Sequence, residues 1–269
     1  MTFDPSMALL GGDVPEGAME LAIAMADAAD AIAARHFRHA FDIEHKADES
    51  PVTIADKETE SAMRSLIAGR FPDHGILGEE HGDEQLDARH VWVIDPIDGT
   101  ASFAIGAPVF GSLIALLEDG KPILGVVNCP AMNERWIGAR GRPTTLNGAP
   151  VRTRTCPDLS AAWHCTTTPA MFERDGEAEA AARLRSRVRR AVWGMDCYAY
   201  GLIANGTLDI VCESNLQPYD YMALVPVVEG AGGKITNWQG DPLSLSSGPT
   251  VLACGDPGLH DAALALLTG

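Results

Sequence analysis

Two stretches in the first 70 residues place apolar side chains every three or four positions, which predicts two amphipathic helices. One face of the first helix is traced by Ala18, Leu21, Ala22, Met25, Ala28, Ala29, Ile32 and His36. The second helix is expected over residues 53–70, with an apolar side formed by Ala55, Met63, Leu66 and Ile67. Between them, the polar, proline-ended stretch 45–51 predicts a mobile loop.

Short apolar runs bounded by turn residues follow, and several of them can pair in one antiparallel sheet. These runs lie at residues 76–77, 91–94, 112–117, 123–127 and 135–139. Further on, strands are expected near 161–166, 208–212 and 234–236, and helices over 177–189, 197–204, 219–231 and from 259 onward. This mixture predicts a layered α/β (α+β) body. Without an internal repeat or a linker, we expect a single domain over 1–269, made of two fused halves, about 1–150 and 151–269.

Composition and charge narrow the class of protein. No apolar run reaches the roughly 20 residues that span a bilayer, and residues 1–12 lack the pattern of a signal peptide. We therefore expect a soluble, cytoplasmic protein without a membrane partner, and assign no role to the first 15 residues. The formal net charge of −17 argues against nucleic-acid binding.

The most informative motif is the run from Asp95 to Thr100, Asp-Pro-Ile-Asp-Gly-Thr, at the end of the apolar strand 91–94. Carboxylates at a strand end suit a hard divalent cation such as Mg²⁺. The turn leaves the carbonyl of Ile97 free as a further oxygen ligand. Gly99 lets the backbone approach a ligand, and the amides of Gly99 and Thr100 can bind phosphate at a helix start. The alternative is a plain turn, because these residue types are common in turns.

Two other acidic segments accompany this motif. Gly78-Glu79-Glu80 follows the strand at 76–77, and Asp220 lies in the first turn of an apolar helix. Taken singly, the glutamates can be a solvated edge and Asp220 can be a helix N-cap.

Together, in this order and spacing and with Glu229-Gly230-Ala231-Gly232-Gly233 after Asp220, the three blocks resemble the inositol monophosphatase family. The resemblance runs from about Lys46 to Gly233. It implies a layered α/β/α/β/α sugar-phosphatase fold, magnesium dependence, inhibition by lithium and usually a homodimer.

The resemblance also assigns roles residue by residue. Glu79, Asp95 and the carbonyl of Ile97 would hold one magnesium ion, and Asp95, Asp98 and Asp220 a second, with two or three Mg²⁺ per active site. Asp56 would partner Thr100, and the two would orient or deprotonate the attacking water, assisted by Glu79. Gly99, Thr100 and Asp220 would contact the substrate. Lys46 matches a lysine of the loop that closes over the site.

Some positions depart from the common inositol-specific branch. Ala101 stands where the family usually has threonine, and Tyr219 where it has tryptophan before Asp220. Asp196 replaces a small apolar residue in a segment that lines the pocket for the alcohol half of the substrate, and an acid there needs a cationic partner. Glu213 matches a family glutamate that reaches the substrate's polar groups.

Two carboxylates facing the leaving group suit an amine better than a neutral polyol. Residues 196–201 and 218–221 resemble the histidinol-phosphate phosphatase branch. We therefore expect in-line hydrolysis of L-histidinol phosphate, a small phosphate monoester, without a phosphoenzyme. One alternative is a phosphatase for inositol-1-phosphate or for sugar phosphates in general. Another is a non-catalytic regulatory homologue.

Overall fold

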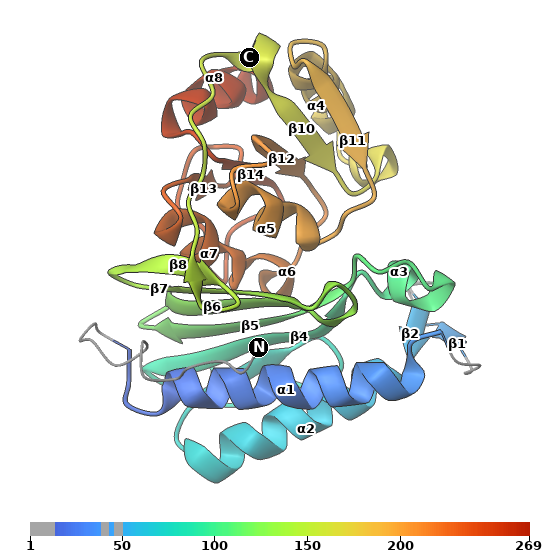
Figure 1. The fold of residues 1–269 in the computed structure, drawn as a ribbon, viewed down its shortest axis with the longest axis vertical. Coiled ribbons are helices and arrows are strands. Elements are labelled where there is room, and N and C mark those ends of the chain that lie inside the picture. The colour runs from blue at the N-terminus through green and yellow to red at the C-terminus, as the bar shows by residue number, and fades with distance from the viewer. Residues whose placement is uncertain (1–13, 39–42, 46–50) are drawn as a thin grey trace.

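The computed structural model describes residues 14–38, 43–45 and 51–269. For residues 43–45 and 51–53 it describes the backbone alone. Two large sheets form the body (Figure 1). The seven-stranded sheet contains, in spatial order, β3 (Gly75–Gly78), β4 (His90–Asp98), β5 (Gly111–Glu118), β6 (Lys121–Cys129), β7 (Glu134–Ala139), β8 (Arg142–Leu146) and β9 (Ala149–Pro150). Strands β3 and β4 are parallel and the other neighbours are antiparallel. The five predicted strands of this sheet are therefore confirmed, while β8 and β9 were not predicted.

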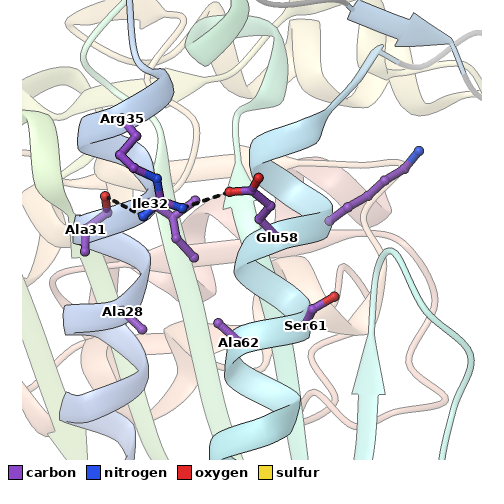
Figure 2. Close-up of a pocket in the computed structure, with 8 residues that line it drawn as sticks. Ala28, Ala31, Ile32, Arg35, Glu58, Ser61 and Ala62 are labelled. Atoms are coloured by element: carbon purple, nitrogen blue, oxygen red, sulfur yellow. Dashed lines mark hydrogen bonds and ion pairs between the residues drawn. The ribbon is translucent and has the colours of Figure 1, made fainter.

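The outer face of this sheet is covered by the two predicted helices, α1 (Ala18–His36) and α2 (Ile54–Arg70) (Figure 1). Leu21, Met25 and Met63 from these helices are buried against the sheet residues Trp92 and Ile114. On the outside, a shallow hollow lies between α1 and α2 (Figure 2). Across it Arg35 pairs with Glu58 at 2.9 Å.

The segment between these helices differs in part from the prediction. Strands β1 (Ile43–His45) and β2 (Pro51–Thr53) pair in antiparallel fashion, so the expected loop over 45–51 was wrong at both of its ends. Lys46, predicted to belong to a closing loop, lies outside the described residues.

The second half of the chain builds a five-stranded sheet. Its spatial order is β11 (Arg190–Trp193), β10 (Trp163–Thr166), β12 (Ile210–Glu213), β14 (Val251–Cys254) and β13 (Lys234–Thr236). Strands β11 and β14 were not predicted. Helices α4 (Glu177–Arg185) and α8 (Pro257–Thr268) pack together and form the outermost layer (Figure 1). The prediction that α4 continues to residue 189 was wrong, because the chain turns there to enter β11.

Three helices lie between the sheets: α5 (Tyr198–Ala204), α6 (Pro218–Tyr221) and α7 (Leu224–Gly230) (Figure 1). The single helix expected over 219–231 is thus broken after Tyr221. Helix α7 packs closely on the first sheet, and a Cβ added at Gly125 of β6 would lie 2.9 Å from the carbonyl carbon of Ala223. The predicted α/β/α/β/α layering is confirmed by this arrangement.

Two further findings concern the cysteines and the helices. All six cysteines are buried and unbridged. Among the described residues, no helix combines the length and the apolar character needed to cross a bilayer.

Candidate active site

Three aspartates from distant parts of the chain converge where β4 ends. Asp95 and Asp98 lie in the last four residues of that strand, where its pairing with β5 becomes irregular, and Asp220 belongs to α6. One carboxylate oxygen from each lies within 4.8 Å of the others. Asp95 is only 1% exposed. The structure therefore brings together three of the predicted metal ligands.

The pKa values of these acids are raised by burial and by each other. Burial raises the pKa of Asp95 well above its usual value, and the charges of Glu79 and Asp98 raise it further. Burial and then the charge of Asp196 raise the pKa of Asp98. Burial raises the pKa of Asp220 to about 7, although the backbone amide of Gln217 partly offsets this by donating to it. Close, desolvated acids of this kind need protons or cations between them.

The donor set fits a hard divalent cation. All three side chains offer carboxylate oxygens, which are the ligands that Mg²⁺ and Ca²⁺ prefer. Within the described part of the chain, Oδ1 of Asp95 has no hydrogen-bond partner although it is buried. Glu79, which follows β3, faces the same region, because its charge raises the pKa of both Asp95 and Asp220. The cluster can therefore hold a metal ion.

The turn that follows Asp95 is held by hydrogen bonds to its own carbonyls. Ser112 Oγ donates to the carbonyl oxygen of Pro96 at 2.6 Å, and Thr100 Oγ1 donates to that of Ile97 at 3.0 Å. Gly99 then adopts a positive φ of 78° and caps the short helix α3 (Thr100–Ile105). The predicted helix start after the aspartates is therefore present.

Asp56, in the first turn of α2, is fully buried, and its charge also raises the pKa of Asp95. Thr100 Oγ1 donates to the carbonyl oxygen of Ile97, which leaves its oxygen lone pairs available to a further donor. Asp56 therefore lies near the cluster, while its partnership with Thr100 stays a prediction.

Asp196 lies beside this turn although it is far away in sequence. It has a positive φ of 43°, and its side chain is half-buried. Ser102 Oγ donates to its Oδ2 at 2.6 Å, and a Cβ added at Gly99 would lie 2.8 Å from the same atom. Burial raises the pKa of Asp196. In residues 14–38, 43–45 and 51–269, no basic side chain forms an ion pair with it.

Glu213, at the end of β12, is more enclosed than expected. It is 3% exposed, and its two oxygens accept hydrogen bonds from the amide of Thr167 at 2.8 Å and from the hydroxyl of Tyr200 at 2.7 Å. Its direct contact with a substrate stays a prediction. Burial raises the pKa of Glu213, and the charge of Asp196 adds to this effect, so the two acids influence each other electrostatically.

Sequence reasoning missed the groups that hold the acids in place. Ser102 holds Asp196, and the backbone amide of Cys197 donates to Asp98 at 2.7 Å. A serine in the first turn of α3 and a backbone amide carry no signal in a single sequence. The family resemblance of residues 196–201 indicated that this segment reaches the site, but not which groups hold its acid.

Comparison with known proteins agrees with this geometry. Residues 16–268 match the model of the inositol monophosphatase family. The bifunctional phosphatase IMPL2, chloroplastic, of Arabidopsis thaliana is 50% identical over 250 residues, which cover 90% of this chain and 72% of that protein. The histidinol-phosphatase of Mycobacterium tuberculosis is 40% identical over 227 residues, covering 82% of this chain and 87% of the relative.

A solved inositol monophosphatase from Zymomonas mobilis superposes with a TM-score of 0.87 at 44% identity, covering 94% of this chain and 98% of that one. A second, from Anabaena, superposes with a TM-score of 0.81 at 29% identity, covering 93% and 94%. These matches confirm the predicted family and the predicted class of enzyme, a phosphoric monoester hydrolase. The chain belongs to the inositol monophosphatase family.

Proposed function

We propose that this chain is a Mg²⁺-dependent phosphatase that hydrolyses L-histidinol phosphate to L-histidinol and phosphate. The observation that carries the proposal is the half-buried Asp196, which lies beside the metal-ligand turn without a basic partner among the described residues. A substrate with a phosphate at one end and an ammonium group near the other can satisfy both the cluster and Asp196.

The cluster would hold two or three Mg²⁺ ions through Glu79, Asp95, Asp98, Asp220 and the carbonyl of Ile97. Bound metal would supply the low pKa of the attacking water and the neutralisation of phosphate charge. Asp56 and Thr100, with Glu79, would orient that water and accept its proton. The amides of Gly99 and Thr100 would hold the phosphate in line, because they lie at the start of α3.

The leaving alcohol would lie toward α5. An ammonium group placed against Asp196 would form an ion pair partly shielded from water, which is worth more than an exposed pair. Glu213 adds negative charge to this part of the site. A neutral polyol would leave the half-buried acid without a charged partner.

The relatives support this choice without deciding it. The matched proteins include histidinol-phosphatases of Mycobacterium tuberculosis, at 40% identity, and of Chlorobaculum parvum, at 34%. They also include an inositol-1-monophosphatase of Synechocystis, at 34% identity. Inositol-1-phosphate, or a broader set of sugar phosphates, is therefore the competing substrate class. We propose in addition a cytoplasmic homodimer, as the resemblance and the composition suggest.

The decisive experiment compares kcat/KM for L-histidinol phosphate and inositol-1-phosphate in the wild type and in Asp196→Asn. We expect the wild type to prefer histidinol phosphate. In the variant, the ratio of the two kcat/KM values should fall at least about tenfold, because one charged contact contributes about 1.4 kcal/mol. Asp175→Asn, at an exposed acid in the same half, is the control.

Two results would count against the proposal. A preference for inositol-1-phosphate that Asp196→Asn leaves unchanged would favour the competing substrate. Calorimetric binding of Mg²⁺ without turnover of any small ester would favour the non-catalytic regulator.

A further inference from the structure

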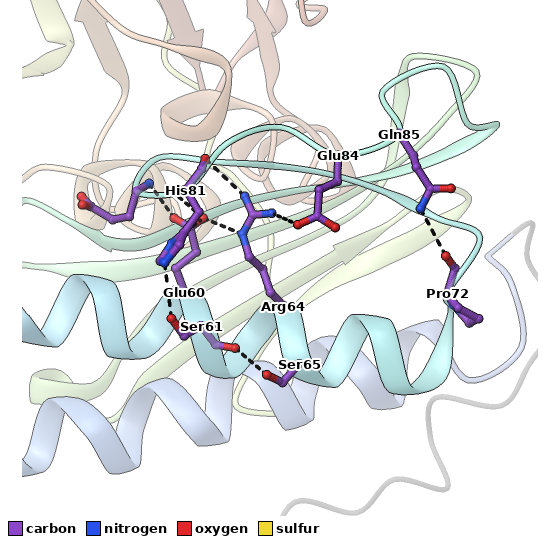
Figure 3. A network of polar contacts seen from close by, with 9 residues as sticks. Glu60, Ser61, Arg64, Ser65, Pro72, His81, Glu84 and Gln85 are labelled. Carbon is purple, nitrogen blue, oxygen red and sulfur yellow. Dashed lines mark hydrogen bonds and ion pairs between the residues drawn. The ribbon is translucent and has the colours of Figure 1, made fainter.

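A second carboxylate, which the catalytic scheme does not use, lies directly behind the Glu79 segment. Glu60 of α2 is fully buried. Its Oε2 accepts the backbone N–H of Glu80 at 2.6 Å, and its Oε1 accepts that of His81 at 3.1 Å (Figure 3). The amide of Glu80 belongs to the peptide bond that follows Glu79. Glu60 thus holds the backbone on which the candidate metal ligand is carried.

The chain approaches Glu60 closely at the preceding residue as well. A Cβ added at Gly78 would lie 2.6 Å from the carboxyl carbon of Glu60, far inside normal contact distance. Only glycine therefore lets the end of β3 lie against this carboxylate. The close approach and the two hydrogen bonds from backbone amides are independent observations that residues 78–81 pack specifically against Glu60.

Glu60 is itself held in position from the other side. Arg64 Nε donates to Oε1 of Glu60 at 2.8 Å, and Arg64 Nη1 pairs with Glu84 at 2.8 Å (Figure 3). His81 Nδ1 lies 3.3 Å from the same oxygen of Glu60. The carboxylate therefore has little freedom to move, and neither has the turn that it binds.

We propose that Glu60 is a positioning residue for metal binding, which fixes the turn after β3 so that Glu79 faces Asp95. This inference rests on the proposed function, since it takes Glu79 as a metal ligand. Groups that orient a metal ligand typically change metal affinity about 10- to 100-fold when they are removed. A buried carboxylate that binds two amides is suited to this task, because both of its oxygens accept and neither donates.

The test is Glu60→Gln, studied by calorimetric titration with Mg²⁺ and by thermal unfolding without metal. The glutamine amide keeps one acceptor but turns an NH₂ group toward a backbone N–H. The Kd for Mg²⁺ should rise about 10- to 100-fold at a temperature where the variant is folded. In turnover assays, the Mg²⁺ concentration needed for half-maximal rate should rise by the same factor, while saturating Mg²⁺ restores most of kcat.

Gly78→Ala is a second route to the same displacement, because its Cβ would push the Glu60 carboxylate away from the turn. It should raise the Kd in the same direction. Gly69→Ala is the matched control, since a Cβ added there on α2 has no neighbour within 4 Å. Glu84→Gln removes the ion pair with Arg64 but keeps both backbone hydrogen bonds to Glu60. This variant should bind Mg²⁺ like the wild type.

The outcomes separate this inference from the proposed function. Wild-type Kd values in folded Glu60→Gln and Gly78→Ala, whatever their melting temperatures, would overturn the positioning role alone. A wild-type protein that neither binds Mg²⁺ nor hydrolyses a phosphate ester would instead remove the proposed function. A raised Kd in both variants, with both controls normal, is the expected result.

Discussion

The backbone amide of Cys197 donates a hydrogen bond of 2.7 Å to Oδ2 of Asp98, across 99 positions of sequence. The two residues come from different halves of the chain: Asp98 ends β4 of the first sheet, and Cys197 precedes α5, which packs under the second. The same segment places Asp196 next to Gly99. The segment 196–197 therefore joins the candidate metal ligand Asp98 to the acid that we propose selects the substrate, Asp196.

Asp95→Asn is expected to abolish turnover without unfolding the protein. Loss of a direct ligand should lower kcat/KM by more than about 100-fold, the upper range for groups that only orient a ligand. Without metal, the melting temperature should stay level or rise, because the variant removes one of several acids that raise each other's pKa. Steady-state kinetics and calorimetry measure both, and activity retained in excess Mg²⁺ would refute the assignment of Asp95.

Ser102→Ala tests the support of Asp196. The serine hydroxyl is the donor that holds Oδ2 of Asp196, at 2.6 Å. Its loss should lower kcat/KM for L-histidinol phosphate about tenfold, as expected for a hydrogen bond to a charged group. Turnover of inositol-1-phosphate should change much less. Ser186→Ala, whose hydroxyl donates only within its own turn to Arg183, serves as the comparison, and an equal loss on both substrates would contradict the prediction.

Metal removal should make stability fall as the pH rises. Burial raises the pKa of Asp220 to about 7, so the folded, metal-free protein keeps protons that the unfolded chain releases near about pH 4. This stabilisation is complete at a pH below the pKa of Asp220 in the unfolded chain. It is lost as the pH rises through the pKa of Asp220 in the folded protein. Mg²⁺ competes with those protons.

The stabilisation by Mg²⁺ should therefore be larger at about pH 7.5 than at about pH 5.5. Thermal unfolding of chelator-treated protein, with and without Mg²⁺ at each pH, measures the difference. An increment in melting temperature that does not depend on pH would show that these carboxylates are ionised without metal.

His164 should contribute an acid-labile part of the stability. Burial, together with the charge of Arg185, lowers its pKa to about 4, and Thr166 Oγ1 lies 3.2 Å from its Nε2. A lowered histidine pKa gives stability that is complete above about 6.5 and decreases as the pH falls toward about 4. One proton changes the unfolding free energy by at most about 1.4 kcal/mol per pH unit. In urea unfolding, His164→Leu should lack this part of the pH dependence, and parallel pH profiles for wild type and variant would contradict it.

The sequence predicted most elements whose pattern is local. The helix over 18–36 and the strand at 234–236 agree with α1 and β13 because their amphipathic and turn signals lie within the element itself. The break between α6 and α7 was invisible, since apolar residues continue through Met222 and Ala223 and both are buried. Strand β11 was hidden by the arginines before it, which an exposed edge strand tolerates.

The candidate site shows the same division. Glu79, Asp95, Asp98 and Asp220 could be named as candidate ligands because a family pattern contains all four. Glu60 could not, since an acid inside an amphipathic helix normally faces solvent. Its significance depends on amides 20 and 21 positions away, which no local pattern records.

Gly125 lies on β6, where no candidate ligand is found, yet its bare backbone lets Ala223 settle against the first sheet. Ala223 comes three positions after Asp220. The distance between Asp220 and the aspartates of β4 therefore depends on the absence of a side chain at Gly125, on the sheet against which Ala223 packs. A larger residue at position 125 would lift α6 and α7 together, and the third carboxylate would leave the cluster without any change in the acids themselves.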